Sequence, residues 1–210
     1  HGSASFLKAG LQYSDFITTV SPTYALEIQG SEYGCGMEKV LQSRSDRLAG
    51  ILNGIDEQEW NPAIDPHLGG YNYDMHSLGM KNQLKAHFLN SIGLKYWPEV
   101  PLIGMVSRFA AQKGISLIES VVEQVLNMGT QMVFLGSGDQ GFVDSLHYFQ
   151  SKYPSQVRVF DTFSTALSHQ IEAASDYFIM PSRYEPCGLN QMYSLRYGTV
   201  PIVFHTGGLA

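Results

Sequence analysis

Pro101–Asp139 reads PLIGMVSRFAAQKGISLIESVVEQVLNMGTQMVFLGSGD, and this stretch decides the fold class. Residues 101–107 form a short, mainly apolar run that is typical of a buried strand. Residues 115–129 carry apolar side chains at helical spacing and end at Gly129, a suitable C-terminal cap. A second apolar run follows at 131–137. Strand, helix and strand in this order predict a unit of a parallel sheet.

The same alternation continues toward the C-terminus. It predicts helices over 140–153, 164–174 and 189–198, and strands over 157–161, 176–182 and 199–205. Pro154 ends the first of these helices, and Ser164 or Thr165 caps the second. Four crossovers in a row, all expected to be right-handed, predict an α/β fold with an open, doubly wound parallel sheet.

The first hundred residues follow no such alternation. They predict a helix leading into a short strand over 5–21, a strand over 46–56 that closes on Asn53-Gly54, and a helix over 78–93. The stretch 61–77 is rich in Pro, Gly, Asn and Tyr, which favours a loop. We therefore expect a domain boundary near residues 51–56, with one domain ending at residue 53 and a second over 54–210.

Composition excludes several classes of protein. A hydrophobic fraction of 44% and a charged fraction of 15% indicate a globular fold. The net charge of −6 argues against a general binder of nucleic acids or membrane surfaces, so a local cluster must hold any anionic ligand. Two cysteines are too few for a disulfide framework, which favours free thiols in a reducing compartment. Since the sequence lacks an initiator Met and stops just after a glycine pair, we expect a fragment.

In open α/β sheets, ligands bind beyond the carboxyl ends of the strands. The first strand of the doubly wound region is followed by Arg108 and Lys113, two cations that could neutralise a diphosphate. Solvated loop charges would give the same pattern. The second strand ends at Gly136 and Gly138, which allow positive φ or a close backbone approach to a ligand, although a plain turn would look alike. Phe163 follows the third strand and could stack on a nucleobase or pack in the core.

The fourth strand is followed by PSRYEPCGLNQ, residues 181–191. We expect a helix to begin within Cys187–Asn190. The free amides of a helix start bind phosphate, and Gly188 permits a ligand to approach the backbone closely. A carboxylate repels phosphate, so Glu185 is better suited to accept hydrogen bonds from the hydroxyls of a sugar. A phosphate site next to a sugar site suggests a nucleotide sugar as the ligand. Glu185 could alternatively cap the helix. His169 is expected to be a surface or core residue, and no Cys/His spacing indicates a metal.

Six segments in register resemble the bacterial glycogen synthase and plant starch synthase family. They are residues 5–29, 51–66, 106–114, 135–139, 185–202 and 206–210. The resemblance implies a two-domain, retaining GT-B glycosyltransferase, in which residues 1–53 end the N-terminal, acceptor-side domain and 54–210 form most of a Rossmann-like C-terminal domain. It implies transfer of glucose from ADP-glucose, possibly UDP-glucose, to the non-reducing end of an α-1,4-glucan, with no cofactor or metal.

Site residues carry over by position. Arg108 and Lys113 match the diphosphate-binding pair of the family, and Glu185 matches its glutamate at the donor sugar. The phosphate-facing amides of the family correspond to Gly188, Leu189 and Asn190, Gly136 stands in its glycine loop, and Phe163 replaces a Tyr against the adenine in some members.

Departures from the family pattern limit the expected activity. Asn190 stands for Thr or Ser, and His205 stands where bacterial members often carry Arg. Tyr193 occupies the position at which a broader class of retaining transferases has a second Glu, which favours the synthase family. The N-terminal lysine-glycine-glycine-leucine loop and the C-terminal segment of the family are absent from this sequence, so we expect the fragment alone to be inactive.

Other functions stay open at this point. One alternative is a nucleotide-sugar-binding domain without catalysis, and another is a retaining glucosyltransferase with a different acceptor, such as a sucrose-type synthase. We expect a cytoplasmic protein if the source is bacterial and a plastid protein if it is a plant or alga, with no nucleic-acid or membrane partner.

Overall fold

The computed structural model describes residues 5–210. Contacts divide the chain into two compact units. The larger unit comprises residues 55–183 and 189–204, and the smaller unit comprises the residues up to Gly54 together with 184–188 and 205–210. The predicted domain boundary near residue 53 concerns the complete protein and stays a prediction.

The larger unit contains a five-stranded parallel sheet with the order β5-β4-β3-β6-β7. Its strands are β3 (Leu102–Val106), β4 (Gln131–Leu135), β5 (Val157–Phe160), β6 (Tyr177–Met180) and β7 (Val200–Val203). Each lies within a predicted strand. The chain adds β4 and β5 on one side of β3, and β6 and β7 on the other. The strand order therefore reverses beside β3, where open α/β sheets place their ligand crevice.

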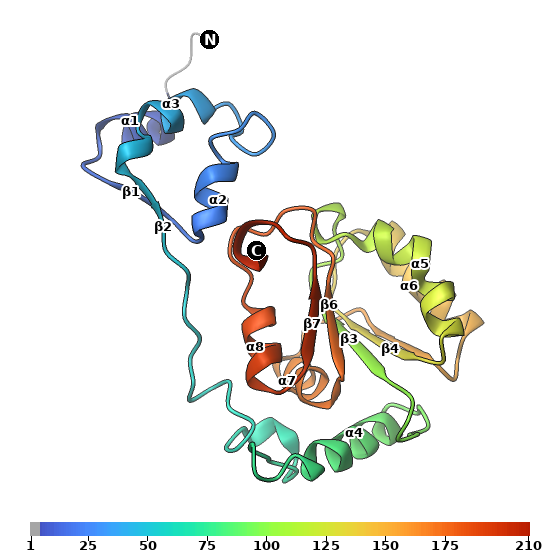
Figure 1. Ribbon diagram of the computed structural model, residues 1–210. Helices are drawn as coiled ribbons and strands as arrows, with labels where there is room; N and C mark the ends of the chain where they lie inside the picture. Colours follow the sequence, from blue (N-terminus) through green and yellow to red (C-terminus); the bar gives the residue numbers. More distant parts are fainter. Residues whose placement is uncertain (1–4) are drawn as a thin grey trace. The chain divides into compact units, whose positions relative to one another are not determined.

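Helices cover both faces of this sheet. They are α5 (Ile115–Asn127), α6 (Gln140–Lys152), α7 (Thr165–Ala174) and α8 (Asn190–Arg196). Figure 1 shows α5 and α6 side by side on one face, with α7 and α8 on the other. A further helix, α4 (Gly79–Ser91), precedes β3 and packs on α7. The predicted α/β, doubly wound parallel fold is confirmed.

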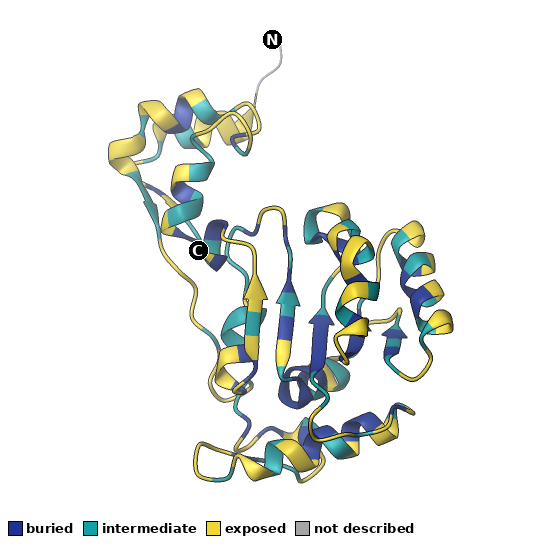
Figure 2. Cartoon of the chain, turned by 45° about the vertical axis from the view of Figure 1, so that its right-hand side comes forward, coloured by how far each residue is buried: buried dark blue, intermediate teal, exposed yellow. Residues whose placement is uncertain are grey.

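Burial follows the strand order. All five residues of β4, an inner strand next to the central strand β3, are buried, whereas β7 at the edge of the sheet is mostly exposed, as Figure 2 shows. The main apolar core lies between the sheet and the α5–α6 layer, with Phe134, Ile118 and Leu146 nearly inaccessible to solvent. Among residues 5–210, no helix combines the length and apolar character that crossing a bilayer requires.

Two of the predicted helices start at a residue whose side chain caps them, and one of these, Ser164, was an expected cap. Ser164 Oγ accepts a hydrogen bond from Leu167 N at 3.2 Å, and Asp139 Oδ1 accepts one from Gly141 N at 2.9 Å. At the other end of a helix, Gly129 has the left-handed φ of 83° that follows a C-terminal cap.

The helix α8 starts at the last residue of the predicted range Cys187–Asn190. The helix begins at Asn190, and its N-cap is Leu189, which makes no side-chain capping hydrogen bond. Gly188 adopts a left-handed φ of 69°, so the chain turns once more before it enters the helix. The N-cap position belongs to Leu189 and not to Glu185, which lies five residues before the first helical residue.

The smaller unit contains short elements. These are α1 (Phe6–Tyr13), β1 (Ile17–Thr19), α2 (Pro22–Glu27), α3 (Glu38–Ser43) and β2 (Leu48–Gly50). The strands β1 and β2 pair in parallel, and β2 covers only three residues of the predicted strand over 46–56. The helices α2 and α3 were not predicted. Glu27 Oε1 joins α2 to the C-terminal segment by accepting hydrogen bonds from Thr206 Oγ1 at 2.9 Å and Gly207 N at 3.0 Å.

Gly136→Ala is expected to destabilise the larger unit by about 1–3 kcal/mol, because the added Cβ would lie 1.7 Å from Ser107 O and the backbone must move. Thermal unfolding should show a melting temperature lower by about 2–12 °C. Gly79→Ala is the matched control, since a Cβ there meets nothing within 4 Å. Equal melting temperatures for the two variants would contradict this reading of Gly136.

Candidate functional site

A cavity of about 390 Å³ lies at the carboxyl edge of the sheet in the larger unit. Its walls come from the ends of β3, β4 and β5, from α7 and α8, and from the loop before α4. The lining residues are Glu59, Trp60, Val106, Ser107, Arg108, Leu135, Gly136, Ser137, Thr162, Phe163, Ser164, Thr165, Ser168, Glu172, Asn190 and Tyr193. Its position agrees with the ligand crevice expected beside the strand β3, and its volume lies within the range of small-molecule sites.

Four predicted site residues line this cavity: Arg108, Gly136, Phe163 and Asn190. Arg108 is exposed, and its Nη2 makes a long contact of 3.5 Å to Gln112 Oε1. Phe163 is 88% exposed, so the alternative that it packs in the core is wrong. The Asn190 side chain donates from Nδ2 to the carbonyl of Val106 at 3.2 Å, which ties the first residue of α8 to the end of β3.

The glycines after β4 do not have the positive φ that was one of the two expectations for them. Neither Gly136 nor Gly138 has positive φ. Added Cβ atoms would instead lie 1.7 Å from Ser107 O and 2.2 Å from Phe109 O. Close approach of the chain that follows β3 therefore requires glycine here, and contact of Gly136 with a ligand stays a prediction.

Lys113 and Leu189 belong to the same unit, but they are not among the described residues that line the cavity. Lys113 ends a 3₁₀ turn over Ala111–Lys113 and is followed by Gly114, whose φ is 73°. A Cβ at Gly114 would lie 2.0 Å from Pro181 O, so this glycine is needed both for its conformation and for packing. Leu189 is the cap residue of α8 and is partly exposed.

Glu185 and Gly188 belong to the smaller unit. Glu185 is only 7% exposed, and its carbonyl accepts a hydrogen bond from Gly208 N at 2.9 Å. Added Cβ atoms at Gly207 and Gly208 would lie 1.9 Å from Glu185 O and 1.8 Å from Cys187 O. The glycine pair near the end of the sequence therefore lets the 185–187 turn pack against it, a reason that the sequence alone did not reveal. Cys35 and Cys187 are both free thiols.

Sequence reasoning missed Glu172 on α7. Glu172 is completely buried, yet it is one of the residues that form the cavity wall. Its Oε2 accepts a hydrogen bond from Ser194 Oγ at 2.7 Å, while Oε1 has no partner among the described residues. Burial raises the pKa of Glu172 well above its usual value, against the opposing effects of the Ser194 hydrogen bond and the Lys81 charge. Thr165, Ser168 and Glu172 recur at helical spacing, which was the available signal.

Trp60 forms an aromatic stack in the cavity wall that was also missed. Its ring lies between those of His169, at 3.8 Å between centroids, and Tyr193, at 3.7 Å. His169 is buried, in agreement with one of the two expected settings for it. Because His169 and Tyr193 belong to α7 and α8, the stack holds the loop containing Trp60 against both helices.

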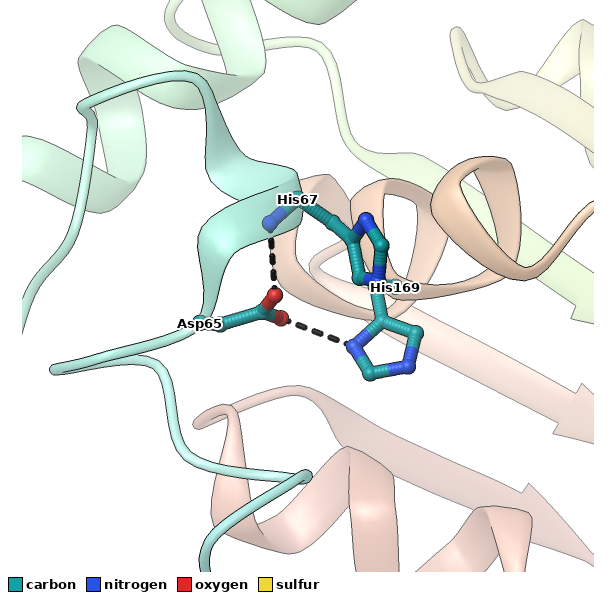
Figure 3. A group of neighbouring side chains, drawn as sticks. All are labelled: Asp65, His67 and His169. Atoms are coloured by element: carbon teal, nitrogen blue, oxygen red, sulfur yellow. Dashed lines mark hydrogen bonds and ion pairs between the residues drawn. The ribbon is translucent and has the colours of Figure 1, made fainter.

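Asp65 links this stack to the core by hydrogen bonds. Figure 3 shows its carboxylate between the backbone N of His67, at 2.8 Å from Oδ1, and the ring of His169, whose Nδ1 lies 2.8 Å from Oδ2. The Tyr197 hydroxyl donates to the same Oδ2 at 2.6 Å. Burial raises the pKa of Asp65, but the hydrogen bonds from His169, Tyr197 and His67 outweigh it and leave the pKa below its usual value.

Asp65, His67 and His169 also place potential metal-ligand atoms within 4.8 Å of one another. The carboxylate of Asp65 already accepts hydrogen bonds from protein groups on both oxygens, and Nδ1 of His169 faces that carboxylate. This donor set therefore does not fit a metal ion. The expectation of no bound metal stays a prediction.

A doubly wound parallel sheet with a cavity at the point where its strand order reverses defines a Rossmann-like α/β domain. Residues 97–210 match the model of the glycosyl transferases group 1 family, and residues 1–43 match the starch synthase catalytic domain. The chain belongs to the glycosyl transferases group 1 family.

Curated relatives and solved structures refine this assignment. The chain is 52% identical over 211 residues to a glycogen synthase from Koribacter versatilis and 51% identical over 209 residues to one from Myxococcus xanthus. Each match covers 100% of this chain and 43% of the relative, so the chain spans less than half the length of these proteins.

Among solved structures, the catalytic domain of starch synthase IV from Arabidopsis thaliana, bound to ADP and acarbose, is 40% identical with a TM-score of 0.90. That match covers 97% of this chain and 42% of the other. A sucrose-phosphate synthase from Thermosynechococcus elongatus is 19% identical with a TM-score of 0.65 over 97% of this chain and 44% of the other, and shares the fold. The predicted resemblance to glycogen and starch synthases and the predicted GT-B fold are confirmed.

Proposed function

We propose that the complete protein is a glycogen or starch synthase that transfers glucose from ADP-glucose to the non-reducing end of an α-1,4-glucan with retention of configuration. The observation that carries this proposal is the cavity beside β3, which combines the cation Arg108 with the exposed ring of Phe163. A guanidinium suits a diphosphate, and an exposed aromatic ring suits a nucleobase. ADP in the similar starch synthase IV structure supports ADP-glucose over UDP-glucose.

The mechanism we propose is mainly electrostatic. Arg108, Lys113 and the amides of residues 188–190 stabilise the negative charge that grows on the leaving diphosphate. Glu185 orients the glucosyl unit or offsets positive charge at its anomeric carbon as the bond to phosphate breaks. A covalent glucosyl intermediate on Glu185 has less support, because nothing in the sequence activates this carboxylate as a nucleophile.

The two other candidate functions have less support. Sucrose-phosphate synthase is similar at a level that indicates fold alone, whereas the relatives near 50% identity are glycogen synthases. Binding without catalysis would need only the cavity. The partners we propose are therefore a nucleotide sugar and an α-1,4-glucan, in the cytoplasm of a bacterium or in a plastid, with no cofactor and no metal.

Lys113→Ala is expected to weaken the binding of ADP to this chain about tenfold, because a charge-assisted hydrogen bond to phosphate contributes about 1.5–3 kcal/mol and part of it is screened by solvent. Isothermal titration calorimetry measures the change. Lys95→Ala removes the same charge from an exposed lysine elsewhere in the larger unit and serves as the control. Equal ADP affinities in the Lys113 variant and the unmodified chain would remove Lys113 from the site.

A further inference from the structure

The indole ring of Trp60 is covered on both faces in the wall of the cavity beside β3. The ring centroid of His169 lies 3.8 Å away at an interplanar angle of 15°, and that of Tyr193 lies 3.7 Å away at 4°. Two near-parallel rings at these distances must lie on opposite faces of the indole. A ligand in the cavity therefore meets the edge of Trp60 at most, and neither a base nor a sugar can stack on it.

The two neighbours of Trp60 differ in how they are held. His169 is 1% exposed, and its Nδ1 lies 2.8 Å from Oδ2 of the buried Asp65. Tyr193 is only partly buried and lines the cavity itself. The contacts thus run from the buried pair of Asp65 and His169 through Trp60 to a side chain that borders the ligand site. Trp60 is the ring through which this buried pair limits the movement of Tyr193.

The helix that carries Tyr193 depends on such contacts for its position. α8 spans seven residues, Asn190–Arg196, and its N-cap residue makes no side-chain capping hydrogen bond. Of the described residues of α8, Ser194 alone is buried. A helix this short is held in place mainly by tertiary packing. Tyr193 follows Asn190 by three residues, a rise of about 4.5 Å, so the Trp60 contact lies within one turn of the helix start that lines the cavity.

We propose that Trp60 is a positioning residue for the nucleotide sugar, which holds Tyr193 and the start of α8 at a fixed place in the cavity wall. Trp60 acts through these groups and contacts no reacting atom. The inference rests on the proposed function, in which the backbone at the start of α8 binds the diphosphate. Loss of the stack lets α8 shift, which weakens binding of the diphosphate in the ground state and in the transition state alike. KM for ADP-glucose should therefore rise while kcat is kept.

The test measures ADP affinity by calorimetry, and KM and kcat for ADP-glucose, on the complete protein. Trp60→Leu keeps an apolar side chain without a flat ring and is expected to weaken ADP and raise KM about tenfold, with kcat within about threefold. Trp60→Phe keeps a flat ring that can stack between His169 and Tyr193, so its ADP affinity and KM should stay within about threefold of the unmodified protein. If Trp60→Leu does not fold, Trp60→Met, which keeps more of the volume without a flat ring, replaces it with the same expected losses.

Tyr73→Phe is the structural control, because Tyr73 ties together the same two helices away from the cavity. Its hydroxyl lies 3.2 Å from the carbonyl oxygen of Ala173 at the end of α7 and 2.8 Å from that of Tyr197, the C-cap residue of α8. Tyr73 is not among the described residues that line the cavity beside β3. Tyr73→Phe should lower the melting temperature by about 2–8 °C and leave ADP affinity within about threefold. Trp97→Leu removes the other tryptophan of the sequence, which is exposed, and should change neither.

Three results would overturn the assignment. The first is unchanged ADP affinity and KM in a folded Trp60→Leu protein. The second is an equal loss of ADP affinity in Trp60→Leu and Tyr73→Phe, since this indicates a purely structural role. The third is a loss of about tenfold in Trp60→Phe as well, which indicates a direct contact of the indole with the ligand. Failure of an unmodified protein that binds ADP to transfer glucose refutes the proposed function, whereas normal transfer with a normal KM in Trp60→Leu refutes only this inference.

Discussion

Replacing Glu185 by alanine in the complete protein is expected to lower kcat for glucose transfer by about 10²–10³-fold while the fold is kept. A group that interacts with the glucosyl unit more strongly as its bond to phosphate breaks lowers the barrier, and its removal costs rate rather than binding. Initial rates of glucose incorporation into glycogen, measured over a range of ADP-glucose concentrations, separate kcat from KM.

Burial of Glu185 makes a structural control necessary, because only 7% of this residue is exposed. Glu185→Gln keeps the size of the side chain and should retain the melting temperature while losing most of the turnover. Glu32→Ala removes an exposed carboxylate from the same unit and should leave the rate unchanged. Near-normal transfer by a folded Glu185→Ala protein would refute the role proposed for this carboxylate.

Asp65→Asn is expected to destabilise the larger unit by about 3–5 kcal/mol, since breaking a buried, hydrogen-bonded charge leaves its partners unsatisfied. Asp65 accepts from His67 N on Oδ1 and faces the Tyr197 hydroxyl and His169 Nδ1 with Oδ2. Asparagine has one acceptor oxygen and would turn an amide N–H toward other donors. Thermal unfolding should show a melting temperature lower by about 6–20 °C.

Acid titration provides a second readout for Asp65. Its folded-state pKa is lower than its ordinary value of 3.8, so the folded protein binds this proton less readily than the unfolded chain does. The stability from Asp65 is therefore present above about pH 4 and is lost as pH falls through the folded-state pKa. The Asp65→Asn variant should therefore lose less stability than the unmodified protein as the pH falls below about 4.

The exposed Asp144 on α6 supplies the control for both measurements. Asp144→Asn makes the same chemical change and should alter stability by less than about 0.5 kcal/mol. If the Asp65 and Asp144 variants unfold at the same temperature, the network of Asp65, His169 and Tyr197 does not stabilise the larger unit in the way proposed.

The sheet and its helices could be predicted because their sequence signals are strong and local. The strands β3 and β4 are uninterrupted apolar runs, α5 carries a regular apolar stripe, and Ser164 and Asp139 stand where caps are required. The rule that ligands lie beyond the carboxyl ends of parallel strands then selected Arg108, Gly136, Phe163 and Asn190, all of which line the cavity.

Short elements and contacts between distant residues could not be predicted in the same way. The six-residue helix α3 begins at Glu38, and its N-cap Met37 makes no side-chain capping hydrogen bond, so no capping side chain marks its start. By contrast, Ser21-Pro22 is a recognisable start for α2, because Ser21 Oγ accepts from Tyr24 N and proline suits the first turn. The contact between Asp65 and His169 joins residues 104 positions apart, and no single-sequence pattern reveals such a pair.

The most direct test of the proposed function is glucose transfer to glycogen by the complete protein, with ADP-glucose and UDP-glucose compared at equal concentrations. We predict incorporation of glucose through α-1,4 linkages with ADP-glucose, at a rate at least tenfold higher than with UDP-glucose. No incorporation from either donor, by a folded protein that binds ADP, would contradict the synthase assignment and favour a nucleotide-sugar-binding protein.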